Sequence, residues 1–407
     1  MLHWAPRTSE RGSLATASRG AHAAGLRIEV SDRLDDLEDV WQRFEAQSVS
    51  TPFQSWPWLA GWAQRKGNET ERPVVALGYE QDVLKIILPL AIERRYGLSS
   101  LVWLGQEVSD YNGPLIDPGL LHRLTVRDAE DILRTVAAIA GGADSVRLEK
   151  QPKAIDGLPN PFAALSASDF TCSAHSAHLA GDWETFYRQR RSGKRVKRQR
   201  QRLSGLGKIG EVTFEEILDP GERRTVTDRL LEWKVLQLDA RGDRNPFRES
   251  GLGAFLKDCS NSPQSSKLIR IHTLKVGGEL AAGTIGIARG SHYIYFVTSY
   301  DAARFGRHSP GSVLLERLIQ AIHAEGFSLF DFSNGDEAYK DEWCDESMGL
   351  TVTLLPLTLA GRAGIAAKAV RLRAIREIKS RPRLFEAIRG VLGRLRGLRA
   401  ERPAPTS

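Results

Sequence analysis

The sequence predicts an α/β protein of the mixed α+β type, built from two similar halves and a basic helical tail. One order of elements occurs twice along the chain: helices, three consecutive strands, then a helix and a further strand. The 407 residues are 41% hydrophobic and 26% charged, which is typical of a globular chain of two to three domains. The basic residues gather in two segments instead of spreading evenly.

The first half is expected to cover residues 26–165. Alternating residues predict strands at 26–31, 73–79, 83–92, 100–104 and 145–149. Helical spacing of apolar residues predicts helices at 37–46, 56–65 and 124–140, and residues 111–118 form a turn-rich extended piece. Residues 1–25 carry charges among Ser, Ala and Gly without the apolar core of a signal peptide, so we expect a disordered leader.

The second half is expected to cover residues 166–360, after a proline-marked linker at Pro152, Pro159 and Pro161. Strands are predicted at 171–179, 210–217, 267–276, 280–288, 291–299, 328–332 and 350–355. Helices are predicted at 183–206, 220–239, 250–258 and 309–325. The repeated order suggests two related halves, although no residue-level repeat is visible between them.

Charge is the clearest asymmetry of the chain. The net charge is +7, yet residues 188–208 and the tail at residues 361–407 each carry +10, which leaves −13 for the remainder. In the tail, apolar residues at 384, 388, 391, 395 and 398 alternate with arginines, as in a basic amphipathic helix. Such a helix contacts a membrane surface or a partner, or lies solvated on its own domain.

The basic helix within residues 188–208 suits RNA or another polyanion. No aromatic residue lies between Arg188 and Leu206, so stacking on single-stranded bases is unsupported. We favour an electropositive rim that attracts an anionic cofactor or substrate over a nucleic-acid interface.

The sequence lacks the residue patterns of disulfides, metal sites, a reactive cysteine and membrane-spanning helices. The three cysteines are far apart, which argues against a disulfide framework and a cysteine zinc site and fits a reducing cytoplasm. His175 and His178 lie on a predicted strand, where they are expected to point to opposite faces, so no metal is expected. Cys344 is interpreted as a packed thiol. No apolar run reaches the roughly 18 residues of a membrane-spanning helix.

One stretch combines an anion-binding turn with polar groups. A turn containing Arg304, Arg307 and His308 follows a predicted strand, and Ser309 is a suitable N-cap for the next helix. Gly311 and Ser312 leave backbone N–H groups uncovered in the first helical turn, where an anion binds readily.

The next strand brings a carboxylate after this turn. Asp331 is the candidate base, with a strand-end cap as its alternative, and Tyr339 and Lys340 follow on a loop. Lys340 is a candidate for an oxyanion or substrate charge, and Tyr339 for protonating a leaving thiolate or forming an aromatic wall. This order suits a cofactor with a pyrophosphate tail held beside catalytic groups.

The stretch SPGSVLLERLIQ…EGFSLFDFSNGDEAYKDEW resembles the bacterial cellulose-biosynthesis (CelD-type) acyltransferases of the GNAT superfamily. FQSWPWLAGW at residues 53–62 and the basic helix before Gly210 are similar to further parts of that family. The layout also resembles the Fem-type peptidoglycan aminoacyltransferases, in which Tyr339 and Lys340 would occupy the position of an aromatic–lysine pair.

The resemblance implies two tandem GNAT-like halves with mixed central sheets. It also implies an acyltransferase that moves an acetyl or longer acyl group from acyl-coenzyme A to an amine or hydroxyl, with N-acetylation as the first expectation. The implied acceptor is a saccharide or small molecule, in exopolysaccharide or envelope synthesis in the cytoplasm or at the inner membrane. Two alternatives stay open: a tRNA-dependent Fem-like transferase, and a catalytically silent scaffold recruited to a synthase through the tail.

Overall fold

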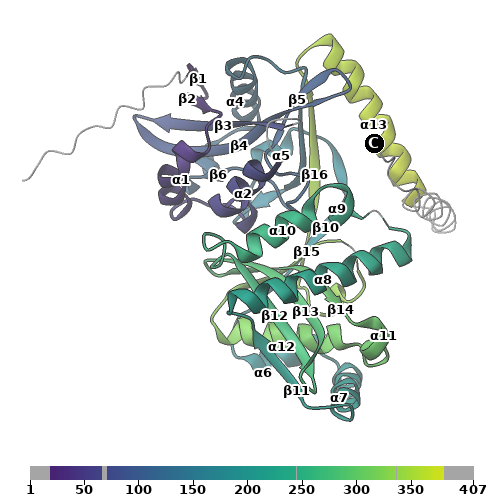
Figure 1. The fold of residues 1–407 in the computed structure, drawn as a ribbon. Coiled ribbons are helices and arrows are strands. Elements are labelled where there is room, and N and C mark those ends of the chain that lie inside the picture. The colour runs from purple at the N-terminus through teal and green to yellow at the C-terminus, as the bar shows by residue number, and fades with distance from the viewer. Residues whose placement is uncertain (1–18, 67–70, 244, 336, 380–407) are drawn as a thin grey trace, which may run out of the picture.

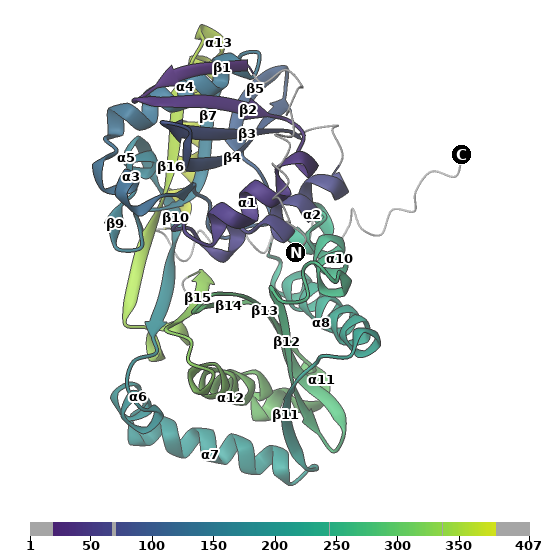
Figure 2. The same cartoon turned by 90° about the vertical axis from the view of Figure 1, so that its left-hand side faces the viewer.

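One continuous sheet runs through the whole molecule and joins two α/β halves (Figures 1 and 2). The computed structural model describes residues 19–66, 71–243, 245–335 and 337–379. The strand order is β1-β2-β3-β4-β5-β7-β16-β10-β15-β14-β13-β12-β11, with β6 beside β4. The prediction of two GNAT-like halves with mixed sheets is confirmed, because parallel and antiparallel pairs occur in each half.

The first half contains ten strands and five helices among the described residues. Its strands are β1 (Arg19–Ala23), β2 (Leu26–Ser31), β3 (Glu71–Glu80), β4 (Val83–Arg95), β5 (Leu98–Trp103), β6 (Leu115–Ile116), β7 (Ser145–Pro152), β8 (Ala154–Ile155), β9 (Leu158–Pro159) and β10 (Ser166–His178). Its helices are α1 (Glu38–Glu45), α2 (Trp56–Lys66), α3 (Pro118–Arg123), α4 (Val126–Ile139) and α5 (Pro161–Ala164).

The second half repeats this plan and adds the C-terminal helix. Its strands are β11 (Val212–Glu216), β12 (Ile269–Val276), β13 (Glu279–Arg289), β14 (His292–Tyr300), β15 (Leu329–Asn334) and β16 (Glu346–Pro356). Its helices are α6 (Trp183–Arg190), α7 (Gly193–Gly207), α8 (Pro220–Arg241), α9 (Pro246–Glu249), α10 (Leu252–Asn261), α11 (Ala302–Phe305), α12 (Pro310–Ala324) and α13 (Leu359–Lys379).

The halves exchange their last strands. The series β2-α1-α2-β3-β4-β5-α4-β7 recurs as β11-α8-α10-β12-β13-β14-α12-β15, and each series ends in a parallel pair, β5 with β7 and β14 with β15. The next strand of the main sheet after β7 in the chain is β10, and it pairs with β15. The strand after β15 is β16, and it pairs with β7. Strands β10 and β16 pair with each other at the centre.

The core between the halves is aromatic. Trp58 is fully buried and packs edge-on against Phe255 of the second half, with ring centroids 4.8 Å apart. Phe53 packs similarly against Phe296 at 5.4 Å. Helices α1, α2, α8 and α10 thus share one hydrophobic cluster over one face of the sheet, whereas α6, α7 and α12 cover the other face of the second half.

The structure corrects three local predictions and leaves a fourth untested. Residues 19–23, placed in the leader, form β1 against β2. The basic helix expected at 183–206 is two helices: the first ends at Arg190, and the side chain of Ser192 caps the second. Ser309 adopts a left-handed conformation (φ 49°), and its side chain makes no capping bond to any described residue. The tail helix expected around residues 384–398 lies outside the described residues.

Candidate functional site

Strands β14 and β15 form a V at the centre of the second half. They pair in parallel only between His292–Ile294 and Leu329–Asp331. Beyond these residues β15 follows β10, whereas β14 continues along β13, so the two strands separate. A bulge in β14 leaves Phe296 without an opposite residue on β13, two residues beyond the last parallel pair. Asp331 lies at the apex.

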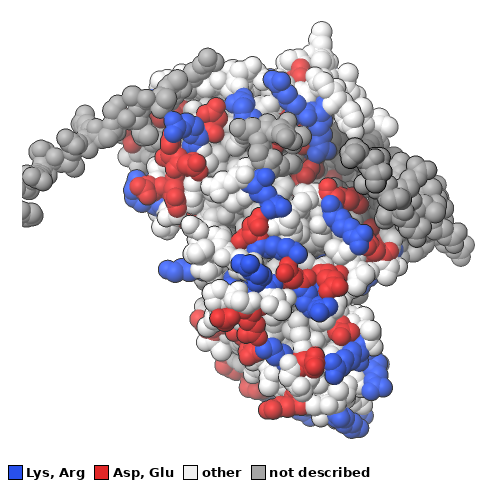
Figure 3. All heavy atoms as spheres, viewed as in Figure 1, with Lys and Arg blue, Asp and Glu red and all other residues white. Residues whose placement is uncertain are grey.

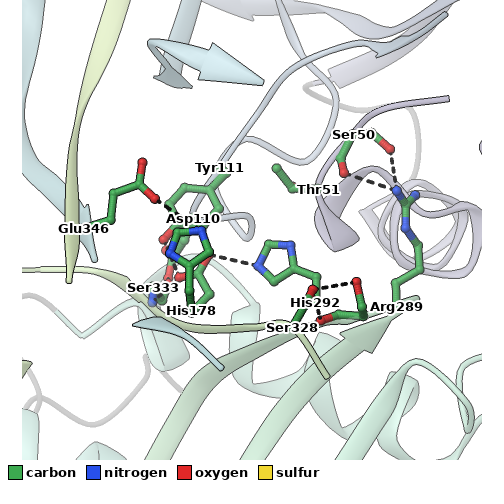
Figure 4. Close-up of polar contacts among 12 residues, drawn as sticks. Ser50, Thr51, Asp110, Tyr111, His178, Arg289, His292, Ser328, Ser333 and Glu346 are labelled. Atoms are coloured by element: carbon green, nitrogen blue, oxygen red, sulfur yellow. Dashed lines mark hydrogen bonds and ion pairs between the residues drawn. The ribbon is translucent and has the colours of Figure 1, made fainter. Parts of the chain in front are cut away.

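A loop of the first half reaches this apex. The Tyr111 hydroxyl donates to Oδ1 of Asp331 over 2.7 Å, although the two residues are 220 positions apart in the chain. Next to Tyr111, the Asp110 carboxylate accepts a hydrogen bond from the hydroxyl of Ser333. The apex is therefore assembled from both halves of the molecule, as Figure 4 shows.

Asp331 is buried and fully engaged. Its Oδ1 also accepts a hydrogen bond from the backbone N–H of Ser333, at 2.6 Å. Ser333 has a left-handed backbone (φ 63°), a strained conformation for serine that points this N–H back at the carboxylate. The other oxygen, Oδ2, lies 3.0 Å from Nε2 of His292. The sequence singled out Asp331 but missed these three partners.

A cavity of about 410 Å³ lies beside this network, between the halves. Its polar lining includes Ser48, Ser50, Thr51, Asp156, His175, Ser176, His178, His292, Asp331 and Glu346. Both His175 and His178 contribute atoms to this lining. Among the described residues, no group of His, Cys, Asp and Glu is suited to hold a metal ion.

Burial shifts the pKa of several side chains around the apex. Burial raises the pKa of the Asp110 carboxyl, against the opposing effects of the Lys150 ammonium and the Ser333 hydroxyl. Burial also raises the pKa of Tyr111, and the neighbouring Asp331 carboxylate raises it further, so the phenol stays a hydrogen-bond donor. Burial raises the pKa of the Cys344 thiol to about 12, which fits a packed thiol.

Lys340 closes the end of β15. Its ammonium is 2% exposed and lies 2.8 Å from the carbonyl oxygen of Asn334, 3.1 Å from that of Gly335 and 3.3 Å from that of Ser333. The Glu337 carboxylate lies 3.0 Å from the same nitrogen, so the ammonium is already engaged by groups at the end of β15. Tyr339 contacts Phe332, and burial raises the pKa of its phenol. Neither residue touches the cavity beside Asp331.

The predicted anion turn lies at the other end of the V, on the far side of β14. Arg304 forms an ion pair with Glu279 and lies against the ring of Phe305, and Arg307 donates to the His308 ring. Gly205 on α7 packs so closely on His308 that a side chain there would overlap the ring. These groups are brought together at the start of α12, but apart from Asp331.

Helix α7 covers the first turn of α12. The Arg202 guanidinium donates to the Ser312 hydroxyl over 2.6 Å, and Gln199 donates to the Ser312 carbonyl over 3.0 Å. Gly311 faces Tyr300, which ends β14. Burial and the neighbouring Arg198 lower the pKa of Arg202. An arginine thus lies at the helix N-terminus where the sequence predicted an anion.

Side chains of α8 bind the exposed edge of β14. Lys234 donates to the Thr298 carbonyl over 3.2 Å, and Gln237 to the Tyr300 carbonyl over 3.4 Å. Burial lowers the pKa of Lys234. In the first half, the corresponding V lies between β5 and β7, and a backbone segment fills it. The backbone N–H of Asn112 in this segment donates to the carbonyl of Lys150 on β7.

The comparisons with known proteins agree with this geometry. Residues 188–341 match the family described as an acetyltransferase (GNAT) domain. No curated protein matches the chain. Among solved structures, FemX is similar over 80% of this chain and 98% of its own, with a TM-score of 0.54 and 10% identity.

Two further structures share the fold. The C-terminal domain of a protein assigned as a lysylphosphatidylglycerol synthetase, from Agrobacterium fabrum, matches 83% of this chain and 97% of its own (TM-score 0.50, 11% identity). A conserved protein of unknown function from Bacteroides thetaiotaomicron matches 80% of this chain and 99% of its own (TM-score 0.51, 12% identity). At such identities the likeness concerns the fold alone.

Proposed function

We propose that the GNAT acyltransferase domain at residues 188–341 transfers an acyl group from acyl-coenzyme A to an amine or hydroxyl bound between the halves. One observation carries the proposal: the apex where β14 and β15 separate holds the Asp331 network and opens into a cavity of about 410 Å³. The thioester would lie in the V, and the acceptor would reach it from the cavity.

The start of α12 is the proposed site of the donor's pyrophosphate. The helix N-terminus favours anions, and Arg202 already lies against Ser312 there. The corresponding helix of the first half offers no such site, because Asp128 forms a capping box with Thr125 and adds a carboxylate to the N-terminus. This asymmetry supports one donor site, in the second half.

The V can open for the donor by side-chain rotation. In the second half, Lys234 and Gln237 hold the edge of β14 through flexible side chains, which a pantetheine arm could displace. In the first half, a backbone segment fills the V and cannot rotate away. The unopposed backbone of Phe296 offers an N–H near the apex that suits the oxyanion of a tetrahedral intermediate.

The chemistry is an acyl exchange. The acceptor nitrogen or oxygen attacks the thioester carbonyl, its proton passes to the base at the apex, and the C–S bond then breaks to release the coenzyme A thiolate. We propose Asp331 and its partners as this base. Tyr339 remains a candidate wall of the donor channel, whereas Lys340 supports the end of β15.

The CelD-type resemblance supports a saccharide acceptor in exopolysaccharide or envelope synthesis. The polar lining of the cavity suits such a hydroxyl-rich molecule. The basic tail supports contact with a membrane surface or a synthase. No helix among the described residues is long and apolar enough to cross a membrane. A silent scaffold attached through this tail would instead keep its role when Asp331 is replaced.

A second donor, aminoacyl-tRNA, is favoured by one feature. Helix α7 exposes Lys194, Lys197, Arg198 and Arg200 to solvent. In Figure 3, basic side chains gather at the lower end of the molecule, where α7 lies in Figure 1. Such a face binds polyphosphates, and the affinity would fall steeply with salt. Strong, salt-sensitive tRNA binding without coenzyme A binding would favour this donor.

Calorimetric titration with acetyl-coenzyme A and with a longer acyl-coenzyme A tests the main proposal. We expect saturable binding to the wild type and its loss in Gly311→Trp, because the indole fills the first turn of α12. Val126→Trp is the matched control, since it places the same group at the start of α4, the corresponding helix. Failure of both thioesters to bind would contradict the proposal.

A further inference from the structure

We propose that His292 is the catalytic base that takes the acceptor's proton, and that Asp331 and Tyr111 position it. This inference rests on the proposed acyl transfer and deepens it. The sequence offered Asp331 alone as the base, but the contacts of the described residues assign the proton-accepting atom to the histidine.

Both oxygens of Asp331 are already engaged by other residues. Oδ1 accepts hydrogen bonds from the Tyr111 hydroxyl and the Ser333 backbone N–H, and Oδ2 faces Nε2 of His292. The residue is 5% exposed. Asp331 touches the cavity only with this small exposed part, whereas the His292 side chain is 20% exposed there and offers the more accessible proton acceptor.

His292 has the geometry of a base held by a carboxylate. The contact of 3.0 Å between Nε2 and Asp331 places the ring hydrogen on Nε2, since a carboxylate can only accept. The lone pair is then on Nδ1, to which no described residue is bonded. The side chain is 20% exposed and lines the cavity. In Figure 4 the ring lies in the space below Thr51.

The first half fixes this pair in place. Tyr111 enters from the loop after β5 and holds Asp331 from the side opposite His292. Its neighbour Asp110 accepts from the Ser333 hydroxyl, and the left-handed turn at Ser333 aims the backbone N–H at Asp331. A substitution in the first half should therefore change catalysis in the second.

Other titratable groups around the cavity come from several elements. They are Asp331 on β15, Tyr111 and Asp110 on the loop after β5, Asp156 after β8, His175 and His178 on β10, and Glu346 on β16. Of these, His178 faces Asp345 and Glu346. Arg289, the last residue of β13, precedes His292 in the chain and forms an ion pair with Glu45. Only Asp331 is bonded to His292 among the interactions of the described residues.

The step balances without a further reactant. The acceptor's nitrogen forms a bond to the thioester carbon while its proton moves to Nδ1 of His292, and Asp331 stabilises the imidazolium. Collapse of the tetrahedral intermediate breaks the C–S bond. The thiolate leaves and takes the proton of the imidazolium, directly or through a bridging water, which restores the neutral ring.

The first test is the tautomer of His292, which does not depend on turnover. The wild type with ¹⁵N-labelled histidine rings is compared with His292→Gln to assign the signal by NMR. We expect a ring protonated at Nε2 with an unprotonated Nδ1. A ring protonated at Nδ1 would overturn the inference, whatever the donor proves to be.

The second test separates catalysis from donor binding. Thiol release from acetyl-coenzyme A is measured with glucosamine and a panel of primary amines, beside calorimetric donor binding. We expect His292→Gly to lower kcat by ~10²-fold or more, with donor affinity and acceptor KM within about threefold of the wild type. Added imidazole should restore part of the rate. His122→Ala, at an exposed site on α3, is the control.

The outcomes distinguish the two proposals. If the wild type binds no acyl-coenzyme A, the proposed function fails, and the NMR result still decides the tautomer. If the wild type turns over and His292→Gly retains its rate within twofold, the inference fails while the function stands. Tyr111→Phe should lower kcat and leave KM unchanged, and a change in KM alone would contradict its positioning role.

Discussion

Replacing Lys340 by methionine should destabilise the protein substantially, because the ammonium joins three backbone carbonyls at the end of β15. The carbonyls of Ser333, Asn334 and Gly335 lie 2.8 to 3.3 Å from Nζ, and the side chain is 2% exposed. Methionine keeps an unbranched chain as far as the Cε position but has no group that donates a hydrogen bond. At about 1 kcal/mol for each buried acceptor left without its donor, the loss is about 3 kcal/mol.

Equilibrium unfolding in guanidinium chloride measures this loss. Glu337→Gln is the matched control: it removes the partly exposed ion-pair partner of the same ammonium, for which we expect less than about 1 kcal/mol. If Lys340→Met lost less than about 1 kcal/mol yet abolished thiol release, the reasoning would be refuted. The ammonium would then act on the substrate, as the sequence first suggested.

Three further predictions concern other parts of the fold. Trp58→Ala should lower the free energy of unfolding by ~3–5 kcal/mol, since the indole is fully buried between the halves; denaturation followed by circular dichroism checks this, and a loss below about 1 kcal/mol contradicts it. Burial lowers the pKa of His272 from 6.5 to about 4, so as the pH falls the unfolded chain binds a proton at this residue at a higher pH than the folded chain does. Stability should be complete above about pH 6.5 and fall by roughly 3 kcal/mol towards pH 4, and His272→Phe should remove that part of the slope in urea titrations at several pH values. Gly205→Val should push α7 away from His308 and speed amide hydrogen exchange in α7, whereas an unchanged exchange rate would show that α7 packs elsewhere.

Local patterns predicted most elements of the fold. Alternating residues located the three antiparallel strands β12, β13 and β14, and Pro310 marked the first turn of α12. These features depend on neighbours in the chain, which a sequence displays. The break at Ser192 was also readable, since a Ser-Gly pair inside a basic helix is a typical N-cap, but the long run of Lys and Arg concealed it.

The site was predictable only in part. Asp331 stood out as a carboxylate between aromatic residues on a strand, whereas its partner Tyr111 lies 220 residues away and carries no local signal. His292 begins its strand directly after a turn, where a polar residue is ordinary. The left-handed turn at Ser333 is imposed by tertiary contacts, because serine alone does not favour it.

The exchange of β10 and β16 has a consequence for synthesis on the ribosome. Strand β7 is complete by residue 152, but β16, which covers its edge, is made only at residues 346–356. For nearly two hundred residues of translation, β7 and β10 present bare edges that could join another chain. Folding of the first half is thereby tied to completion of the second, and we expect nascent chains stalled before residue 346 to depend on chaperones.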